Sequence, residues 1–249
     1  MFYSVKLPAI AGFAVAGVVI GCGGGGSSAG TSGSLSCGPN YLTPNYTVAT
    51  DPGNGEPNFL LTWAGFPLRV HFENNITYDN NGSTVTGSDI VLEAAQRWID
   101  ASGGAASLTI TNQSANADIV VRFNNIGSSP GPGSTLGTTQ ITYYPSNNTI
   151  ARAVITMNYW PGMSQAEFME GFKHTAAHEV GHALFLQGHS DHASDVMFYQ
   201  GSTTQDSPLT TRDSNSLVTA YCGNFRSRNR AVPEPVGPTK TIEISCAAR

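Results

Sequence analysis

Apolar side chains recur at helical spacing in residues 88–102, where Ile90, Val91, Ala94 and Trp98 share one face. This period predicts an amphipathic helix. Capping and stop signals predict where this helix and two later helices begin and end. The first predicted helix runs from a cap at Ser88 or Asp89 to Gly103 and Gly104, and the second runs from a capping box at 164–167 to about Gln187. The third follows residues 209–213 and runs to about Tyr221.

An alternation of apolar and polar residues predicts β-strands before and between these helices. Residues 60–73 alternate in this way after Pro67, whereas the Gly-, Pro- and Ser-rich residues 127–137 indicate a loop. The order of elements is typical of the α+β class, and no repeat or second domain is visible. The predicted strands are 60–73, 108–111, 119–123, 140–144 and 151–157.

Residues 1–21 are predicted to be a signal peptide that lies outside the fold. One positive charge, Lys6, precedes an apolar run that is too short to span a membrane. The run ends in Val-Ile-Gly-Cys, which resembles a bacterial lipoprotein cleavage box with Cys22 as the lipidation site. The alternative is an ordinary secretory signal with an incidental cysteine. We expect an exported protein, lipid-anchored to the bacterial cell envelope or cell surface, or released outside the cell.

Composition and cysteine content agree with export. Charged residues are only 12% of the 249 residues, and a net charge of −5 without a long basic run argues against a nucleic-acid partner. An oxidising compartment makes a disulfide the default. Cys222 paired with Cys246 would fix the C-terminal residues to the last helix, whereas Cys37 paired with either would fix the N-terminal segment. The sequence leaves this choice open.

Residues 178–182, His-Glu-Val-Gly-His, carry the pattern HExxH. Residues four apart lie on one face of a helix, so His178 and His182 can occupy two corners of a tetrahedral zinc site. Glu179 follows the first of them and can reach a water on the metal. Gly188 breaks the helix directly before His189, the candidate third ligand. The alternative is an exposed helix with two solvated histidines.

Residues 178–197 read HEVGHALFLQGHSDHASDVM and resemble the matrixin branch of the metzincin zinc peptidases, whose pattern is HExxHxxGxxHxxD followed by a methionine turn. Phe185 stands where the family has glycine, and His189 comes one residue late. We interpret this departure as a one-residue insertion, in which Gly188 leaves the helix with a positive φ. The rival third ligands are His192, Asp191 and Asp195, and His174 is expected only to contact the site.

The resemblance implies that His178, His182 and His189 hold one zinc ion through neutral imidazoles. Glu179 would take the proton of the attacking water and deliver it to the leaving amine. Structural calcium occurs in several family members, but the candidate oxygen ligands of this chain form no calcium loop.

The same resemblance suggests roles for three further residues. Met197 should pack beneath the metal without binding it. Tyr199 either takes part in catalysis, as a tyrosine at that place does in some metzincins, or lines the substrate pocket. Cys37 loosely resembles the pro-segment cysteine that blocks zinc in some matrixins, but the arginine and the spacing of that motif are absent.

The implied fold is a metzincin-like domain with a twisted, mainly parallel five-stranded sheet, three helices and an active-site cleft. In that family the edge strand above the cleft binds substrate by adding peptide to the sheet, and residues 151–158 would occupy or adjoin this place. The expected ranges are 1–21 for the lipoprotein signal peptide, 22–57 for a Gly/Ser-rich tether and irregular segment, 58–222 for the catalytic domain and 223–249 for a C-terminal tail.

The favoured hypothesis is a monomeric zinc endopeptidase that acts on extracytoplasmic proteins or peptides and meets the membrane through the lipid on Cys22. One alternative is a non-catalytic zinc-bearing surface module that binds a partner. The intact Glu179 argues against it, because binding has no use for a general base. Another alternative is an amidase that acts on cell-wall peptide, which a panel of substrates would separate from the first.

Overall fold

The computed structural model describes residues 38–228 and 237–249 of the chain. The predicted signal peptide, the lipidation site Cys22 and Cys37 lie outside the described residues. No helix in the described part of the chain is long and apolar enough to cross a membrane.

Helix α1 (Gly87–Ala101) begins at a capping box formed by Thr86 and Asp89. The Thr86 hydroxyl accepts a bond from the backbone N–H of Asp89, and the Asp89 carboxylate accepts one from the N–H of Thr86. The expected caps, Ser88 and Asp89, are therefore wrong by two or three residues. The helix ends before Gly103 and Gly104, whose positive φ angles follow the predicted stop.

The main sheet has seven strands in the order β10-β11-β7-β8-β6-β2-β5. Strands β5, β2, β6 and β8 are parallel to one another. Strand β7 pairs antiparallel with β8, β11 pairs antiparallel with β7, and β10 pairs in parallel with β11. The strands are β2 (Leu68–Phe72), β5 (Leu108–Ile110), β6 (Ile119–Asn125), β7 (Thr135–Tyr144), β8 (Thr149–Tyr159), β10 (Gln200–Gly201) and β11 (Lys240–Ala248).

The α+β class is confirmed, but two expectations, the number of strands and the C-terminal tail, are wrong. The described sheet has seven strands instead of five, because β10 and β11 extend it beyond β7. The segment 223–249, expected to be a tail, contains β11. The segment 151–158 belongs to β8, an interior strand between β6 and β7, so it adjoins the outer strands without being an edge.

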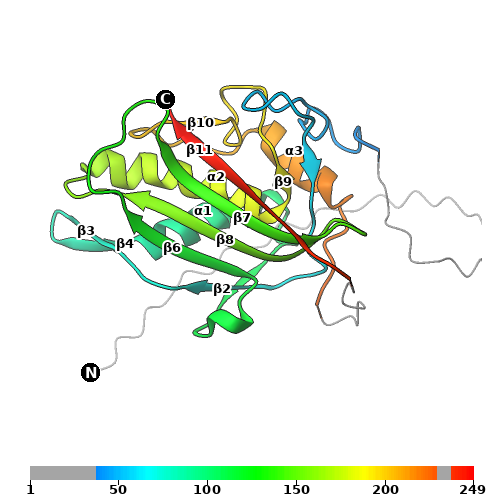
Figure 1. Ribbon diagram of the computed structural model, residues 1–249, viewed down its shortest axis with the longest axis horizontal. Helices are drawn as coiled ribbons and strands as arrows, with labels where there is room; N and C mark the ends of the chain where they lie inside the picture. The colour runs from blue at the N-terminus through cyan, green and yellow to red at the C-terminus, as the bar shows by residue number, and fades with distance from the viewer. Residues whose placement is uncertain (1–37, 229–236) are drawn as a thin grey trace, which may run out of the picture. The chain divides into compact units, whose positions relative to one another are not determined.

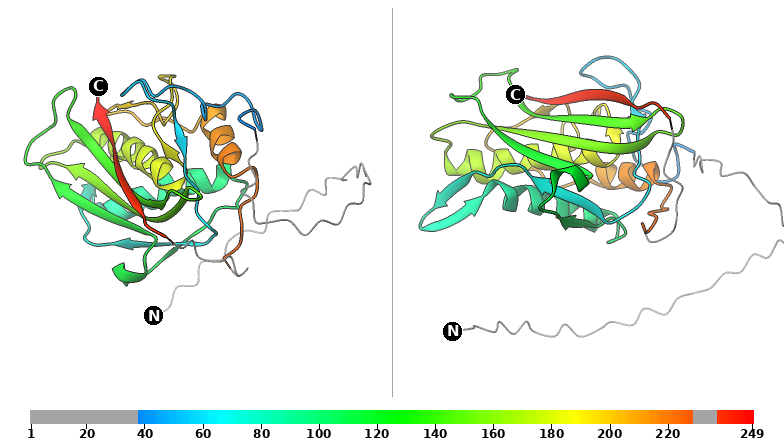
Figure 2. Two further views of the ribbon diagram at one scale, coloured as in Figure 1. Left: turned by 45° about the vertical axis from the view of Figure 1, so that its right-hand side comes forward. Right: turned by 60° about the horizontal axis from the view of Figure 1, so that its bottom comes forward.

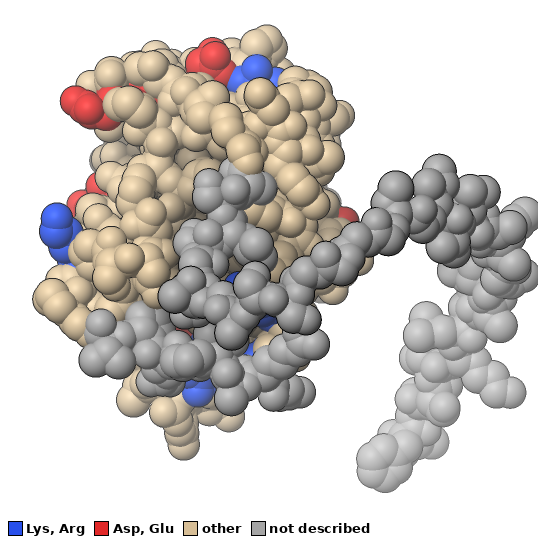
Figure 3. Space-filling model, turned by 90° about the vertical axis from the view of Figure 1, so that its right-hand side faces the viewer, with Lys and Arg blue, Asp and Glu red and all other residues tan. Residues whose placement is uncertain are grey.

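Helices α1 and α2 (Phe172–Leu184) cover one face of the sheet, and α3 (Thr211–Ala220) packs against α1 beyond it (Figures 1 and 2). The core between these layers is apolar. Trp98 is fully buried there, and its indole N–H donates to the carbonyl of Ala177 in α2 at 2.8 Å. This bond fixes α1 against the helix that carries the HExxH pattern. Charged side chains of both signs are sparse on the face seen in Figure 3.

Short elements complete the domain. The hairpin β3 (Thr77–Asn80) to β4 (Ser83–Thr86) was not predicted, although Asn81 and Gly82 at its turn both adopt the positive φ that such hairpins need. Strand β1 (Phe59–Leu60) pairs with β9 (Leu186–Gln187), and Ser114–Asn116 form a 3₁₀ turn. The predicted strand 60–73 is thus split into β1 and β2 around Pro67.

Candidate metal centre

Helix α2 places His178 and His182 on one face, one turn apart. The helix is preceded by a π-helical turn, Glu167–Gly171, which the predicted capping box between Ser164 and Glu167 opens. Both imidazoles are fully buried, and their Nε2 atoms lie 2.9 Å apart. The solvated-histidine alternative is therefore wrong for this helix.

The exit from α2 brings a third histidine back to the first two. The helix ends at Leu184, three residues before the predicted end, because β9 turns away to pair with β1. Gly188 then adopts a φ of 113°, which confirms the predicted role of this glycine. The carbonyl of His189 accepts a bond from the Asn58 amide at 2.8 Å. As a result, one ring nitrogen from each of the three histidines lies within 4.8 Å of the others.

Each of the three rings is oriented by an oxygen that can only accept a hydrogen bond from Nδ1. His178 donates to the carbonyl of Val196 at 2.8 Å, and His182 donates to the carbonyl of Leu186 at 2.8 Å. His189 donates to the Asp51 carboxylate at 3.0 Å. The proton on each Nδ1 leaves a lone pair on each Nε2, which is the form that binds a metal.

The converging Nε2 atoms fit a cation. The Nε2 atoms of His178 and His182 face each other with two lone pairs, and the buried Nε2 of His189 has no hydrogen-bond partner among residues 38–228 and 237–249. Burial lowers the pKa of His178 well below its usual value and that of His182 to about 3, so both rings stay neutral. Three neutral imidazoles suit zinc.

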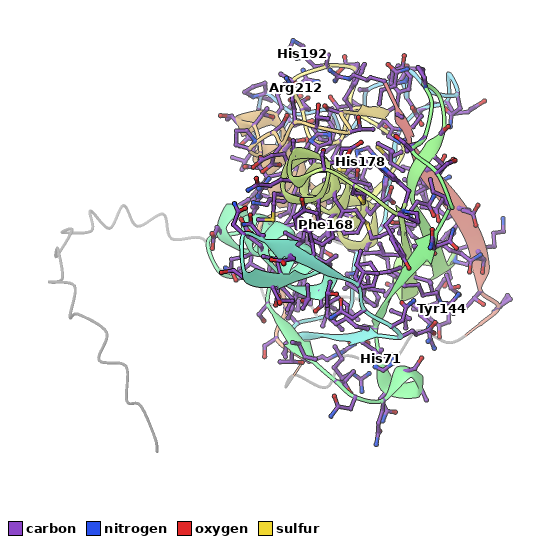
Figure 4. All side chains as sticks on the ribbon, turned by 90° about the vertical axis from the view of Figure 1, so that its left-hand side faces the viewer. His71, Tyr144, Phe168, His178, His192 and Arg212 are labelled. Atoms are coloured by element: carbon purple, nitrogen blue, oxygen red, sulfur yellow. The ribbon has the colours of Figure 1, made fainter. Side chains whose placement is uncertain are left out.

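The rival ligands are engaged elsewhere. Asp195 accepts bonds from Ser190, Thr210 and Arg212, and Asp191 pairs with Arg212. His192 bonds to Ser194 and lies, with Arg212, near one end of the domain, away from His178 (Figure 4). In the described residues, the only cluster of three converging donors is His178, His182 and His189.

Glu179 lies beside this cluster and is fully buried against β7. Its Oε2 accepts a bond from the Thr139 hydroxyl at 2.6 Å, and a Cβ on Gly137 would lie only 2.8 Å from its Oε1. Burial raises the pKa of Glu179 to about 8, although the bonds from Thr139 and from the backbone of Cys246 oppose the rise. Among the described residues Oε1 makes no hydrogen bond, and the backbone N–H of Cys246 is the donor that points toward this carboxylate.

Met197 of the methionine turn packs against Gly181, the glycine of the HExxH segment. Met197 is fully buried, and a Cβ on Gly181 would collide with its sulfur, so the glycine of the motif permits this close approach. The ring of Tyr199 lies 6.5 Å from that of His189, centroid to centroid. This distance places Tyr199 beside the third ligand, where both of its predicted roles remain open.

Sequence reasoning missed two carboxylates that hold the site. Asp51 orients His189 and also accepts a bond from the N–H of Gly53, an Asx turn that the sequence Asp-Pro-Gly could have suggested. Asp213 accepts bonds from Tyr46 and from the N–H of Val196, which anchors the methionine turn to α3. Only its place as the third residue of a capping box was visible locally.

The cysteine choice is narrowed by the structure. Cys222 is disulfide-bonded and Cys246 is a buried free thiol, so these two do not pair. The partner of Cys222 lies outside the described residues.

The comparison with family models agrees with this geometry. The matrixin model matches residues 70–222, a range that includes α1, α2, the three histidines and the methionine turn. The chain belongs to the matrixin family, which implies a zinc metallopeptidase. A search among curated proteins found no match.

Proposed function

We propose that the chain is a zinc endopeptidase that hydrolyses peptide bonds of extracytoplasmic proteins. The observation that carries this proposal is the convergence of three Nε2 lone pairs next to a buried carboxylate. His178, His182 and His189 would hold the ion. Zinc would supply a Lewis acid that polarises the scissile carbonyl and acidifies water.

Glu179 performs the proton transfers in this proposal. Its buried carboxylate, next in sequence to His178, would accept a proton from water and return it to the leaving amine. The Thr139 hydroxyl holds one carboxylate oxygen, which leaves the other to meet the water. Tyr199, whose ring lies 6.5 Å from that of His189, would either support the reacting carbonyl or line the substrate pocket.

The test compares Glu179→Gln with the exposed control Glu170→Gln in the zinc-loaded protein. Casein cleavage and zinc content are measured on the same samples. Glu179→Gln should keep zinc but lose cleavage by roughly 10²–10⁴-fold, because it removes the general base, whereas Glu170→Gln should match the wild type. Equal cleavage by both variants would refute the role of Glu179. Zinc without cleavage in any of them would favour the binding-module alternative.

A parallel assay with crosslinked cell-wall peptide separates the amidase alternative, which predicts cleavage of that substrate alone. The proposal also includes export and lipid attachment at Cys22, supported by the sequence of residues 1–34. Metabolic labelling with a radioactive fatty acid tests it, since Cys22→Ser should abolish incorporation.

A further inference from the structure

Strand β11 runs between two elements that border the candidate metal centre. On one side it pairs antiparallel with β7 from Lys240 opposite Tyr143 to Cys246 opposite Gly137. On the other side Ala247 and Ala248 pair in parallel with β10, which directly follows the methionine turn. Figure 1 shows β11 as the red strand beside β7, and it also contacts α2.

The last residues of this segment are held from both sides. The N–H of Ala248 donates to Ser134 at 2.8 Å, and the N–H of Arg249 donates to Gly201 at 3.0 Å. The Arg249 guanidinium bonds to the carbonyls of Gln200 and Ala193 at 3.1 and 3.0 Å. A C-terminal peptide of this chain therefore fills the space between β7 and β10.

This peptide closes the site around the general base. Cys246 lies opposite Gly137, the residue against which the Glu179 carboxylate packs, and its backbone N–H points to that carboxylate. Glu179 and Cys246 are both fully buried. A substrate carbonyl must approach Glu179 to react, so β11 and a bound substrate exclude each other.

Strand β11 is also separate from the family domain. The matrixin match ends at residue 222, and the intervening sequence contains Pro233, Pro235 and Pro238. Prolines cannot donate to a sheet ladder, so this sequence suits a connection better than a strand. The strand itself is bound by backbone pairing and by partial burial of Ile242 and Ile244.

We infer that β11 is an intramolecular occupant of the substrate groove, which competes with an extended peptide for the groove and so lowers the activity of the full chain. The inference rests on the proposed function for the identity of that peptide as substrate. Backbone pairing to a strand edge gives affinity for any extended chain, and side-chain pockets add selectivity.

The side chains of β11 also indicate which peptides fit the groove. Cys246 and Ala248 are the two fully buried side chains of β11, and both are small. A Cβ on Gly201 would lie 3.0 Å from the Cys246 sulfur. The backbone at Gly201 therefore already lies against the Cys246 side chain. The groove should therefore prefer small residues at these two positions and reject bulky ones.

A reversible lock tests the inference in the full chain. Thr142 and Thr241 are cross-strand neighbours whose hydroxyl oxygens lie 3.1 Å apart, so Thr142→Cys with Thr241→Cys can form a disulfide between β7 and β11. A release variant, Ile242→Asp with Ile244→Asp, removes apolar contacts of the same strand. Ser245→Asp adds a charge at an exposed neighbouring position and serves as its matched control.

Three readouts are made on each protein: cleavage of casein, capture of a labelled peptide and the rate of zinc removal by a chelator. The peptide is KTIEISSAAR, which follows β11 with serine in place of cysteine, and KTIEISWAAR is its bulky control. The release variant should capture the first peptide and cleave casein at least about ten-fold better than Ser245→Asp, because it loses the partly buried apolar contacts of Ile242 and Ile244 that hold the strand. The oxidised lock should do neither, and reduction should restore the wild-type values.

Capture and zinc removal do not need peptidase activity, so the two proposals fail in different ways. If no protein cleaves casein but the release variant captures the small peptide and loses zinc faster, the peptidase proposal fails and the occupancy of the groove stands. If the oxidised lock captures peptide or cleaves casein as well as its reduced form, β11 does not occupy the groove. Equal capture of both peptides would overturn the selectivity. Wild type treated with the same reductant controls for the native disulfide.

Discussion

The Asp51 carboxylate accepts a hydrogen bond from Nδ1 of His189 at 3.0 Å, across 138 positions of sequence. Both side chains are buried. Burial is the largest single influence on the Asp51 carboxylate and disfavours its charge, but the bonds from His189 and from the N–H of Gly53, together with the charge interactions with His189 and His182, outweigh it and lower the pKa of Asp51. The third ligand, displaced by one residue from the family pattern, is thus oriented by a carboxylate from the N-terminal irregular segment.

Asp51→Asn should weaken zinc binding by roughly ten- to a hundred-fold, because loss of an orienting carboxylate lowers the basicity and order of a ligating histidine. Competition with a chromophoric chelator measures the affinity. Glu56→Gln, an exposed change in the same turn, should leave it unaltered. An Asp51→Asn protein with wild-type affinity would show that Asp51 does not position the ligand.

His189→Ala should remove most of the bound zinc, whereas His192→Ala should retain it. The first change deletes one of three converging nitrogens, while His192 is bonded to Ser194 away from the cluster. Metal content after dialysis, measured by atomic absorption, decides between them. The reverse result would reinstate His192 as the third ligand and refute the one-residue insertion.

The parts of this site that were predictable depend on local sequence. His178 and His182 share a face because of helix geometry alone, and the positive φ of Gly188 follows from glycine chemistry. The end of α2 was misjudged because it depends on the pairing of β9 with β1, and Asp51 was missed because its contact is far along the chain.

Strand β11 was missed as well. Ile242, Ile244 and Cys246 alternate with polar residues, a pattern that is typical of a half-buried strand. A strand at this place depends on pairing with β7, about a hundred residues earlier, which local sequence does not show. Its partner β7 was also predicted too short, since residues 135–139 fell partly in a Gly/Pro/Ser loop.

Gly181→Ala should destabilise the domain, although alanine ordinarily favours a helix by about 1 kcal/mol over glycine. The new methyl group would overlap the Met197 sulfur and lie 2.9 Å from Trp98 Cζ2. Overpacking of this kind costs roughly 1–3 kcal/mol, which exceeds the helical gain. Urea unfolding measures the free energy, and adding Met197→Ala should recover part of the loss. Strict additivity of the two changes would contradict the contact.

His174 should make the domain less stable as the pH falls. Burial lowers the pKa of His174 to about 4, with Arg249 and Arg97 adding to the effect and Asp206 opposing it. The folded state therefore resists protonation that the unfolded chain accepts at a pKa of 6.5. The contribution of neutral His174 to stability is complete above this value and is lost as the pH falls from there toward 4.

Between about pH 7.5 and about pH 5, wild type should lose roughly 2 kcal/mol of unfolding free energy more than His174→Gln, which has no ring to protonate. Urea unfolding of zinc-loaded proteins at both values measures this. Acid release of zinc destabilises both proteins through the same three ligands, so the difference between them reports His174. Parallel losses in the two proteins would show that the ring is already charged, or solvated, in the folded state.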